Sequence, residues 1–254
     1  MNKSPEGLVW LKEVDSTNRF AQSLVESGKA THGTAIMADY QTAGKGQKGN
    51  KWESEPGKNM LATFIFFPAF LKTQNLFIIN QLVCVSICDI LEQYTQEPFS
   101  IKWPNDILFG ERKIAGVLVE NSLRGSVVQH SIIGVGINLN QITFNEYEPK
   151  AVSLFTISGN EVSRTDEFTI KLRNSISSYF QLLEVNPGKQ NEITKAYMIR
   201  LFGLNQKRKF VYDGKLSDGT IEGVDDNGQL IMELEGRKIV LGPKEVRFVF
   251  DQNH

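Results

Sequence analysis

The spacing of apolar residues predicts a mixed chain of helices and strands. Apolar positions that recur every three or four residues predict helices at residues 76–94, 168–183 and 193–202. Short apolar runs bounded by turn residues predict strands at residues 8–14, 34–39 and 60–67, and several more between 99 and 139. Because strands and helices do not alternate regularly, we expect an α+β fold in which helices cover one face of a largely antiparallel or mixed sheet.

A group of helix-capping residues follows the first predicted strand. Ser16, Thr17 and Asn18 carry side chains that cap helix N-termini, and a short amphipathic helix of about ten residues follows, with Gly28 suited to its C-cap. Capping alone accounts for these residues. Their small hydroxyl and amide groups would also suit an uncharged polar ring as a ligand.

The pattern changes after Leu204. Residues 205–250 form five short apolar runs separated by tight turns of the Asp-Gly, Asn-Gly and Glu-Gly type. Such turns join neighbouring antiparallel strands, and five short strands are typical of a small barrel. We therefore expect a larger domain at residues 1–203 and a small β-barrel domain at residues 204–254.

Composition narrows the functional classes. The net charge is −1, so no basic field over the whole chain favours a nucleic-acid or membrane partner. Cys84 and Cys88 lie one turn apart on the apolar face of a predicted helix, as core thiols do. The three histidines are scattered and form no metal or catalytic-triad pattern. The N-terminus has no apolar signal segment, so a cytoplasmic protein is expected.

A glycine-rich loop lies between the second and third predicted strands. Gly44, Gly46 and Gly49 fit the spacing G-x-G-x-x-G, but a strand follows them where the dinucleotide fingerprint requires a helix. That interpretation is therefore excluded. The same loop carries three lysines, Lys45, Lys48 and Lys51, so it is either an anion-binding loop or a solvated hairpin.

Three further motifs carry polar or glycine residues inside apolar segments. In Lys102-Trp-Pro-Asn-Asp106, a plain turn or the wall of a pocket for a planar charged ligand both fit. Lys113 enters an apolar strand that contains Gly116, where a glycine is costly unless something approaches closely. Gly134 and Gly136 leave one strand face bare, either for a ligand or for a packed helix.

Taken in chain order, these motifs resemble those of the biotin protein ligases. The matching motifs are Asp15-Ser-Thr-Asn18, the glycine loop with its trailing Trp52, Lys102-Trp-Pro-Asn-Asp106, Lys113-x-x-Gly116 and Gly134-x-Gly136-x-Asn138. The resemblance implies a catalytic domain like that of class II synthetases, followed by an SH3-like barrel. It covers nearly the whole chain.

The resemblance also implies a reaction. Biotin and MgATP would give biotinyl-5′-AMP, and the biotinyl group would pass to a lysine of a biotin carboxyl carrier domain of a biotin-dependent carboxylase. The implied catalytic residues are Lys113 and Lys45. The implied biotin-binding residues are Ser16, Thr17, Asn18, Gln41, Lys45, Gly46, Gln47, Lys113 and Gly116. The implied adenylate-binding residues are Lys48, Trp52, Lys102, Asn105, Asp106 and Asn138, with Asp106 also a possible metal ligand.

The glycine loop departs from the family pattern. Lys45, Gln47 and Asn50 stand where the family commonly has arginines, and glutamine makes no charge-assisted contact to phosphate. Either the adenylate is retained less tightly, or Lys48 compensates for the missing arginines. Ordering a dozen loop residues costs about 1–2 kcal/mol each, so the loop is expected to order only over bound adenylate.

Other functions stay open at this stage. A lipoate or octanoate ligase shares the implied fold, and a non-catalytic biotin sensor would keep the same pocket. Only fifteen residues precede Ser16, too few for a DNA-binding domain, so the form without a repressor function is expected. Either a monomer or a homodimer fits the sequence.

Overall fold

The structure is a computed structural model that describes residues 7–46 and 50–250. Seven strands form the main sheet in the order β1-β2-β3-β7-β6-β5-β4. These strands are β1 (Leu8–Val14), β2 (Thr34–Gln41), β3 (Met60–Phe66), β4 (Ser100–Lys102), β5 (Asp106–Phe109), β6 (Arg112–Arg124) and β7 (Val127–Ile137). Strands β1 and β2 run parallel, and every other neighbouring pair runs antiparallel. The predicted α+β class with a mixed sheet is confirmed.

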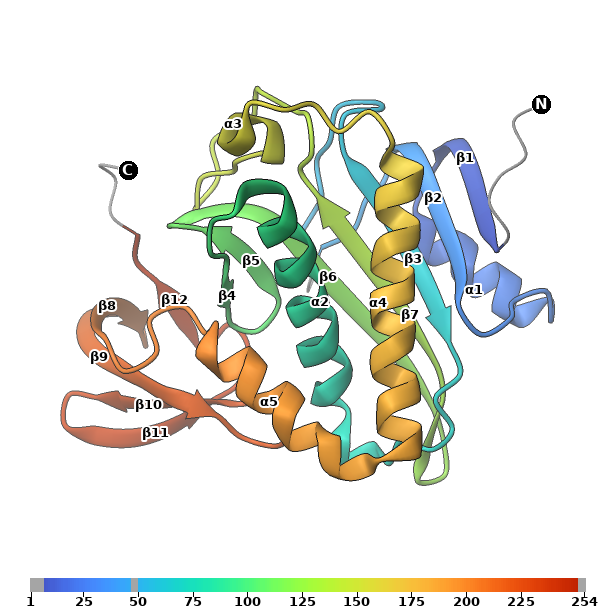
Figure 1. The fold of residues 1–254 in the computed structure, drawn as a ribbon. Coiled ribbons are helices and arrows are strands. Elements are labelled where there is room, and N and C mark those ends of the chain that lie inside the picture. Colours follow the sequence, from blue (N-terminus) through green and yellow to red (C-terminus); the bar gives the residue numbers. More distant parts are fainter. Residues whose placement is uncertain (1–6, 47–49, 251–254) are drawn as a thin grey trace.

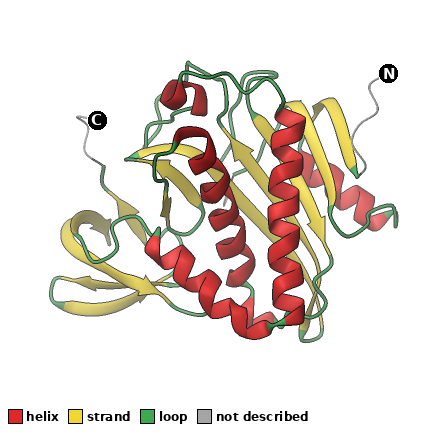
Figure 2. Ribbon diagram, in the orientation of Figure 1, coloured by secondary structure: helices red, strands yellow, loops and turns green. Residues whose placement is uncertain are grey.

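Two long helices, α2 (Phe77–Thr95) and α4 (Thr165–Val185), lie across one face of this sheet (Figure 1). Helix α5 (Gln190–Ile199) packs beside α2, and the short α3 (Leu154–Ser158) lies at the end of the sheet (Figure 2). Two 3-10 turns, Thr73–Asn75 and Pro187–Lys189, precede α2 and α5. Helix α2 is long and apolar enough to cross a membrane, but most of it is buried inside the fold.

One helix departs from the predicted single helical layer. Helix α1 (Thr17–Glu26) packs through Ala21 against Ile36 and Ile65. The neighbours of these isoleucines along the strands, Met37 and Phe64, belong to the other core. Because side chains alternate across a strand, α1 covers the face opposite α2 and α4. The continuous apolar runs of β2 and β3 reflect burial on both faces.

The end of one helix and the whole of another were not visible in the pattern. Helix α5 ends at Ile199, although apolar residues continue to 202. There the chain turns to pair with β4, since Ile101 N–H donates to the Arg200 carbonyl (2.7 Å) and Phe202 N–H to that of Ile101 (2.9 Å). The prediction of a helix to residue 202 was therefore wrong at its end. Helix α3 was not predicted, because five residues contain too little of a helical period.

The C-terminal strands form a second sheet, as predicted. They are β8 (Lys207–Tyr212), β9 (Lys215–Val224), β10 (Leu230–Leu234), β11 (Arg237–Leu241) and β12 (Val246–Phe248), in the antiparallel order β11-β10-β9-β8-β12. Phe210, Ile221 and Leu230 of this sheet belong to the same hydrophobic cluster as Tyr197 of α5. The Trp103 indole N–H also donates to the Gly228 carbonyl (2.8 Å). The two sheets therefore share one continuous core.

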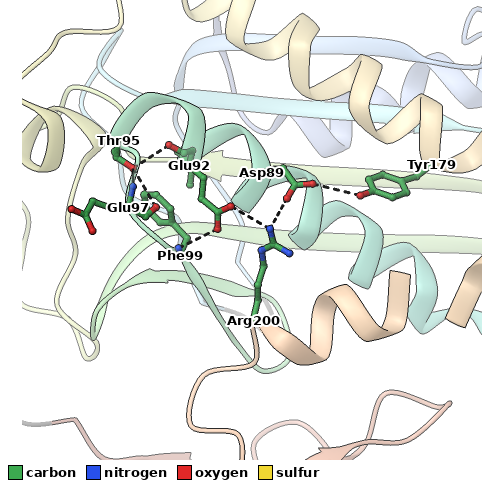
Figure 3. Close-up of polar contacts among 8 residues, drawn as sticks. Asp89, Glu92, Thr95, Glu97, Phe99, Tyr179 and Arg200 are labelled. Atoms are coloured by element: carbon green, nitrogen blue, oxygen red, sulfur yellow. Dashed lines mark hydrogen bonds and ion pairs between the residues drawn. The ribbon is translucent and has the colours of Figure 1, made fainter. Parts of the chain in front are cut away.

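A cluster of charged residues links the segment that follows α5 to the helices on the main sheet (Figure 3). Arg200, directly after α5, pairs with Asp89 (2.7 Å) and Glu92 (3.2 Å) of α2. Tyr179 of α4 donates to Asp89 at 3.5 Å. Three helices thus meet around one guanidinium, beside the point where the chain passes to the C-terminal sheet.

Candidate functional site

A cavity of about 670 Å³ opens where the main sheet meets the C-terminal sheet. Its walls come from the start of α1, the loop before residue 53, the β4–β5 turn, β6, β7 and the C-terminal sheet. The predicted site residues that line it are Ser16, Thr17, Asn18, Gln41, Lys45, Gly46, Trp52, Lys102, Asn105, Asp106, Lys113, Gly116 and Asn138. Gln47 and Lys48 lie outside the described residues. The fold therefore gathers every described member of the predicted set around one pocket.

One end of the pocket is uncharged and hydrogen-bonded. Gln41 Oε1 accepts from the backbone N–H (2.7 Å) and the hydroxyl (2.9 Å) of Thr17. Thr63 Oγ1 of β3 lies 2.8 Å from Thr17 Oγ1 and 2.6 Å from Asn18 Oδ1. Asn18 Nδ2 donates to Glu120 (2.6 Å). Capping does not account for these side chains, because Ser16 at the N-cap makes no side-chain capping bond.

The glycine face of β7 is filled by protein side chains. A Cβ on Gly134 would overlap the Asn18 carboxamide, and one on Gly136 would overlap the Trp52 indole. The sequence left open whether this bare strand face holds a ligand or a packed helix. The structure gives a different answer at each of the two glycines. The first residues of α1 occupy the position at Gly134, and an aromatic side chain from the glycine loop occupies the position at Gly136.

The other end of the pocket is charged. Asp106 Oδ1 lies 2.6 Å from Lys113 Nζ, and Oδ2 lies 3.0 Å from Lys102 Nζ. Burial alone would raise the pKa of Asp106, but the two ammonium groups outweigh it and hold that pKa below its usual value. Two cations face one anion, so an excess of positive charge is directed at the cavity. A plain turn at 102–106 does not explain this arrangement.

Trp52 stands between the two ends. Its indole lies beside Gly116 and Gly136, and Lys113 Nζ is 5.5 Å from the ring centroid. The backbone holds it in place, since Trp52 N–H donates to the Gly44 carbonyl (3.0 Å). Its indole N–H is buried and finds no partner among the described residues. A buried donor without a partner is costly, so this indole N–H is available to donate a hydrogen bond to a ligand.

Two residues that were predicted to contact the adenylate donate hydrogen bonds from their side-chain amides to the backbone of the pocket wall. Asn105 donates to the Val117 carbonyl, and Asn138 donates to the Val152 carbonyl (3.2 Å). These bonds hold the β4–β5 turn against β6 and the segment before α3 against the end of β7. In this structure both amide groups therefore stabilise the wall of the pocket.

Several residues at the site were not predicted from the sequence. Thr63 of β3 and Glu120 of β6 support the uncharged end. The ring centroid of Phe248, in the C-terminal sheet, lies 5.4 Å from Lys102 Nζ. Arg247 pairs with Glu148 (3.2 Å) at the pocket rim. An alternating strand pattern marks these positions only as inward or outward, so their proximity to the motifs becomes visible only in the folded chain.

The described residues do not build a resident metal site. No group of three His, Cys, Asp or Glu side chains lies close enough to hold an ion within residues 7–46 and 50–250. Both oxygens of Asp106, the possible metal ligand, are held by lysines. The donor set around Asp106 therefore does not fit a dedicated protein-bound cation.

Comparisons with known proteins give a consistent result. Residues 10–138 match the model of the biotin/lipoate A/B protein ligase family. The biotin–[acetyl-CoA-carboxylase] ligase of Paracoccus denitrificans is 29% identical over 248 residues, covering 94% of this chain and 99% of the relative. The bifunctional ligase/repressor BirA of Bacillus spizizenii is 28% identical over 90% of this chain and 70% of its own length. The Aquifex aeolicus biotin protein ligase, solved with biotin and ATP, is 30% identical with a TM-score of 0.77, covering 96% of this chain and 100% of that one.

Proposed function

The chain belongs to the biotin/lipoate A/B protein ligase family and acts as a biotin protein ligase, and we propose that the pocket described above, with one uncharged and one charged end, carries both half-reactions. In the first, a biotin carboxylate oxygen attacks the α-phosphorus of ATP, and the bond to pyrophosphate breaks. In the second, a carrier lysine amine attacks the acyl carbon of biotinyl-5′-AMP. The acyl–oxygen bond breaks, AMP leaves, and the amine loses a proton as the amide forms.

The contrast between the two ends of the pocket is the observation that carries this proposal. Ser16, Thr17, Asn18 and Gln41 offer neutral hydrogen-bonding groups that suit the uncharged ureido ring of biotin. The Lys102–Asp106–Lys113 cluster offers the excess positive charge that suits a carboxylate and a phosphate. A cavity of about 670 Å³ is large enough for the two substrates end to end.

Lys113 is the central catalytic group in this proposal. Its ammonium, beside Gly116 at the charged end of the cavity, neutralises both the carboxylate and the α-phosphate as they approach. Lys45 reaches the same cavity from the glycine loop and adds a second charge. Because the carboxylate is already ionised at neutral pH, no general base is needed, and catalysis rests on positioning and charge.

The adenosine side is assigned to the remaining predicted residues. Trp52, whose indole N–H has no partner within residues 7–46 and 50–250, lies against the nucleotide, and Lys102 contacts its phosphates. Asn105 and Asn138 hold the wall against which the nucleotide packs. Mg²⁺ enters as part of the MgATP substrate, bound through its phosphates, and neutralises their charge.

The glycine loop is proposed to close over the adenylate and to exclude water from a hydrolysable anhydride. Gly46 and Lys45 belong to its described flank, where Gly46 N–H donates to the Asn50 carbonyl (2.7 Å). Gln47 and Lys48, at the tip, lie outside the described residues, so loop ordering stays a prediction. A Gln47→Arg variant is expected to slow release of biotinyl-5′-AMP. An unchanged release rate would argue against a phosphate contact at that position.

We propose that the acceptor is the biotin carboxyl carrier domain of a biotin-dependent carboxylase and that the reaction takes place in the cytoplasm, where ATP is available. Strand β1 forms one edge of the main sheet among the described residues, and a homodimer would form where a second copy adds to such an edge. Size-exclusion chromatography with light scattering decides between monomer and homodimer.

ATP–pyrophosphate exchange tests the proposed function directly. Purified protein is assayed with biotin, lipoate, octanoate or no acid, alongside the Lys113→Ala variant. Exchange that requires biotin and is lost in Lys113→Ala supports the proposal. Exchange with lipoate or octanoate instead would assign the chain to the lipoate branch. Tight biotin binding without exchange would indicate a sensor.

A further inference from the structure

Two residues behind the wall of the pocket support its uncharged end. Thr63 of β3 is fully buried, and Glu120 of β6 reaches Asn18 from the other side. We infer that Thr63 and Glu120 are positioning residues that fix the orientation of Asn18, as Gln41 fixes the hydroxyl of Thr17. The Thr17 hydroxyl and the Asn18 amide oxygen then face a ligand as acceptors, so that this wall selects ring N–H donors. The inference rests on the proposed binding of biotin at this end.

The orientation of Asn18 follows from Glu120. A carboxylate only accepts hydrogen bonds, so the Asn18 atom 2.6 Å from Glu120 Oε2 must be the amide nitrogen. The amide oxygen of Asn18 then faces Thr63, whose hydroxyl lies 2.6 Å away. Thr63 must therefore donate its one proton to Asn18.

The orientation of Gln41 follows in the same way. The backbone N–H of Thr17 can only donate, so the Gln41 atom 2.7 Å away is the amide oxygen. The same oxygen lies 2.9 Å from the Thr17 hydroxyl, which must donate its proton to it. The hydroxyl oxygens of Thr63 and Thr17 lie 2.8 Å apart, but both hydroxyl protons are then donated to other acceptors.

A proton count gives the polarity of the wall. Three hydroxyl contacts share two hydroxyl protons, so neither threonine has a proton left for a ligand. Thr17 Oγ1 and Asn18 Oδ1 can therefore serve a ligand only as acceptors. A cyclic urea presents two ring N–H donors and matches such a wall, whereas a ring that offers an oxygen in place of an N–H meets acceptors facing acceptors.

Thr63→Val tests this inference because it removes the hydroxyl at nearly constant shape. We expect the KM for biotin to rise about 10-fold, a size consistent with a lost hydrogen bond, while the KM for ATP stays within 2-fold. Discrimination between biotin and its cyclic-carbamate analogue, in which oxygen replaces one ring N–H, should fall as well. Thr63→Ser should restore both properties because it keeps the hydroxyl. Glu120→Gln should weaken the discrimination, since a carboxamide no longer fixes the orientation of Asn18.

Thr169→Val is the matched control. Thr169 is also fully buried, and its hydroxyl donates to the Thr165 carbonyl within α4, away from the pocket. It should share any loss of thermal stability seen in Thr63→Val and leave both KM values unchanged. Unchanged biotin KM and discrimination in Thr63→Val, or equal losses in Thr63→Ser, would overturn the inference alone. A wild-type protein without biotin-dependent exchange would overturn the proposed function, and the inference with it.

Discussion

Two clusters of charged residues have similar geometry and opposite charge balance. At the pocket, two lysines share one carboxylate, with distances from Asp106 of 2.6 and 3.0 Å. At the helix junction of Figure 3, one guanidinium shares two carboxylates, with distances from Arg200 of 2.7 and 3.2 Å. The pocket cluster therefore carries an excess positive charge, and the junction cluster carries an excess negative charge.

The two aspartates have opposite pKa shifts. The pKa of Asp106 is lowered because two neighbouring ammonium groups outweigh its burial. The pKa of Asp89 is raised because its burial, with Glu92 close by, outweighs the attraction of Arg200. A carboxylate with a shifted pKa is often taken as a sign of a catalytic site. Here Asp106 lies at the pocket, whereas Asp89 lies at a contact between helices.

The difference shows that the sign of the excess charge is more informative than the number of ion pairs. A ligand with two anionic groups gains from the two lysines that face the cavity, and Asp106 keeps them from repelling each other while the cavity is empty. None of the junction residues lines the cavity, and their bonds hold α2, α4 and the start of the C-terminal segment together. The first cluster should therefore affect substrate binding and turnover, and the second should affect stability.

Lys102→Met should have the largest effect and act on substrate binding. The change leaves one lysine facing Asp106, which removes the excess positive charge, and a hydrogen bond to a charged group is worth about 1.5–3 kcal/mol. We expect the KM for ATP to rise about 10- to 100-fold and the KM for biotin to stay within 3-fold. Steady-state exchange at varied ATP measures the effect.

Lys102→Arg provides the comparison for that variant. It keeps the charge, so most of the affinity for ATP should return. If both variants lost ATP affinity equally, packing of Lys102 against Phe248 would be the cause and not its charge.

Arg200→Met should have an intermediate effect and act on stability. It leaves Asp89 and Glu92 without their shared cation, at a cost of about 1–2 kcal/mol because all three groups are partly exposed. The melting temperature should fall by about 2–8 °C, whereas exchange per folded molecule should stay within 3-fold. A loss of exchange without a loss of stability would show that the junction controls the pocket.

Most strands were predicted from the sequence, and the predicted site residues that the structure describes all line one pocket, because strands and motifs are both encoded in short contiguous segments. Strand β1 appears as an apolar run with the predicted bounds, and motifs such as Lys102-Trp-Pro-Asn-Asp106 are contiguous. The side of the sheet on which α1 packs could not be predicted, because β2 and β3 are apolar on both faces.

The supporting residues could not be predicted either. Thr63 reaches Thr17 across 46 positions of sequence, and Glu120 reaches Asn18 across 102. No local pattern records such pairings, since they depend on how β3, β6 and the start of α1 meet in space. Trp52 was assigned to the nucleotide side by its motif, whereas its place between Gly116 and Gly136 emerged from the fold.

The smallest expected effect is a difference in acid stability between Asp106→Asn and Asp89→Asn. The pKa of Asp106 is lowered on folding, so its stabilising contribution is complete above the usual value of 3.8 and is lost as pH falls through the lower folded pKa. The pKa of Asp89 is raised, so the wild type loses stability as pH increases from 3.8 to the folded pKa. Wild-type stability relative to Asp106→Asn should therefore rise with pH, and relative to Asp89→Asn it should fall. Urea unfolding at several pH values from 3 to 6 measures both differences, and slopes of the same sign would contradict the opposite charge balance of the two clusters.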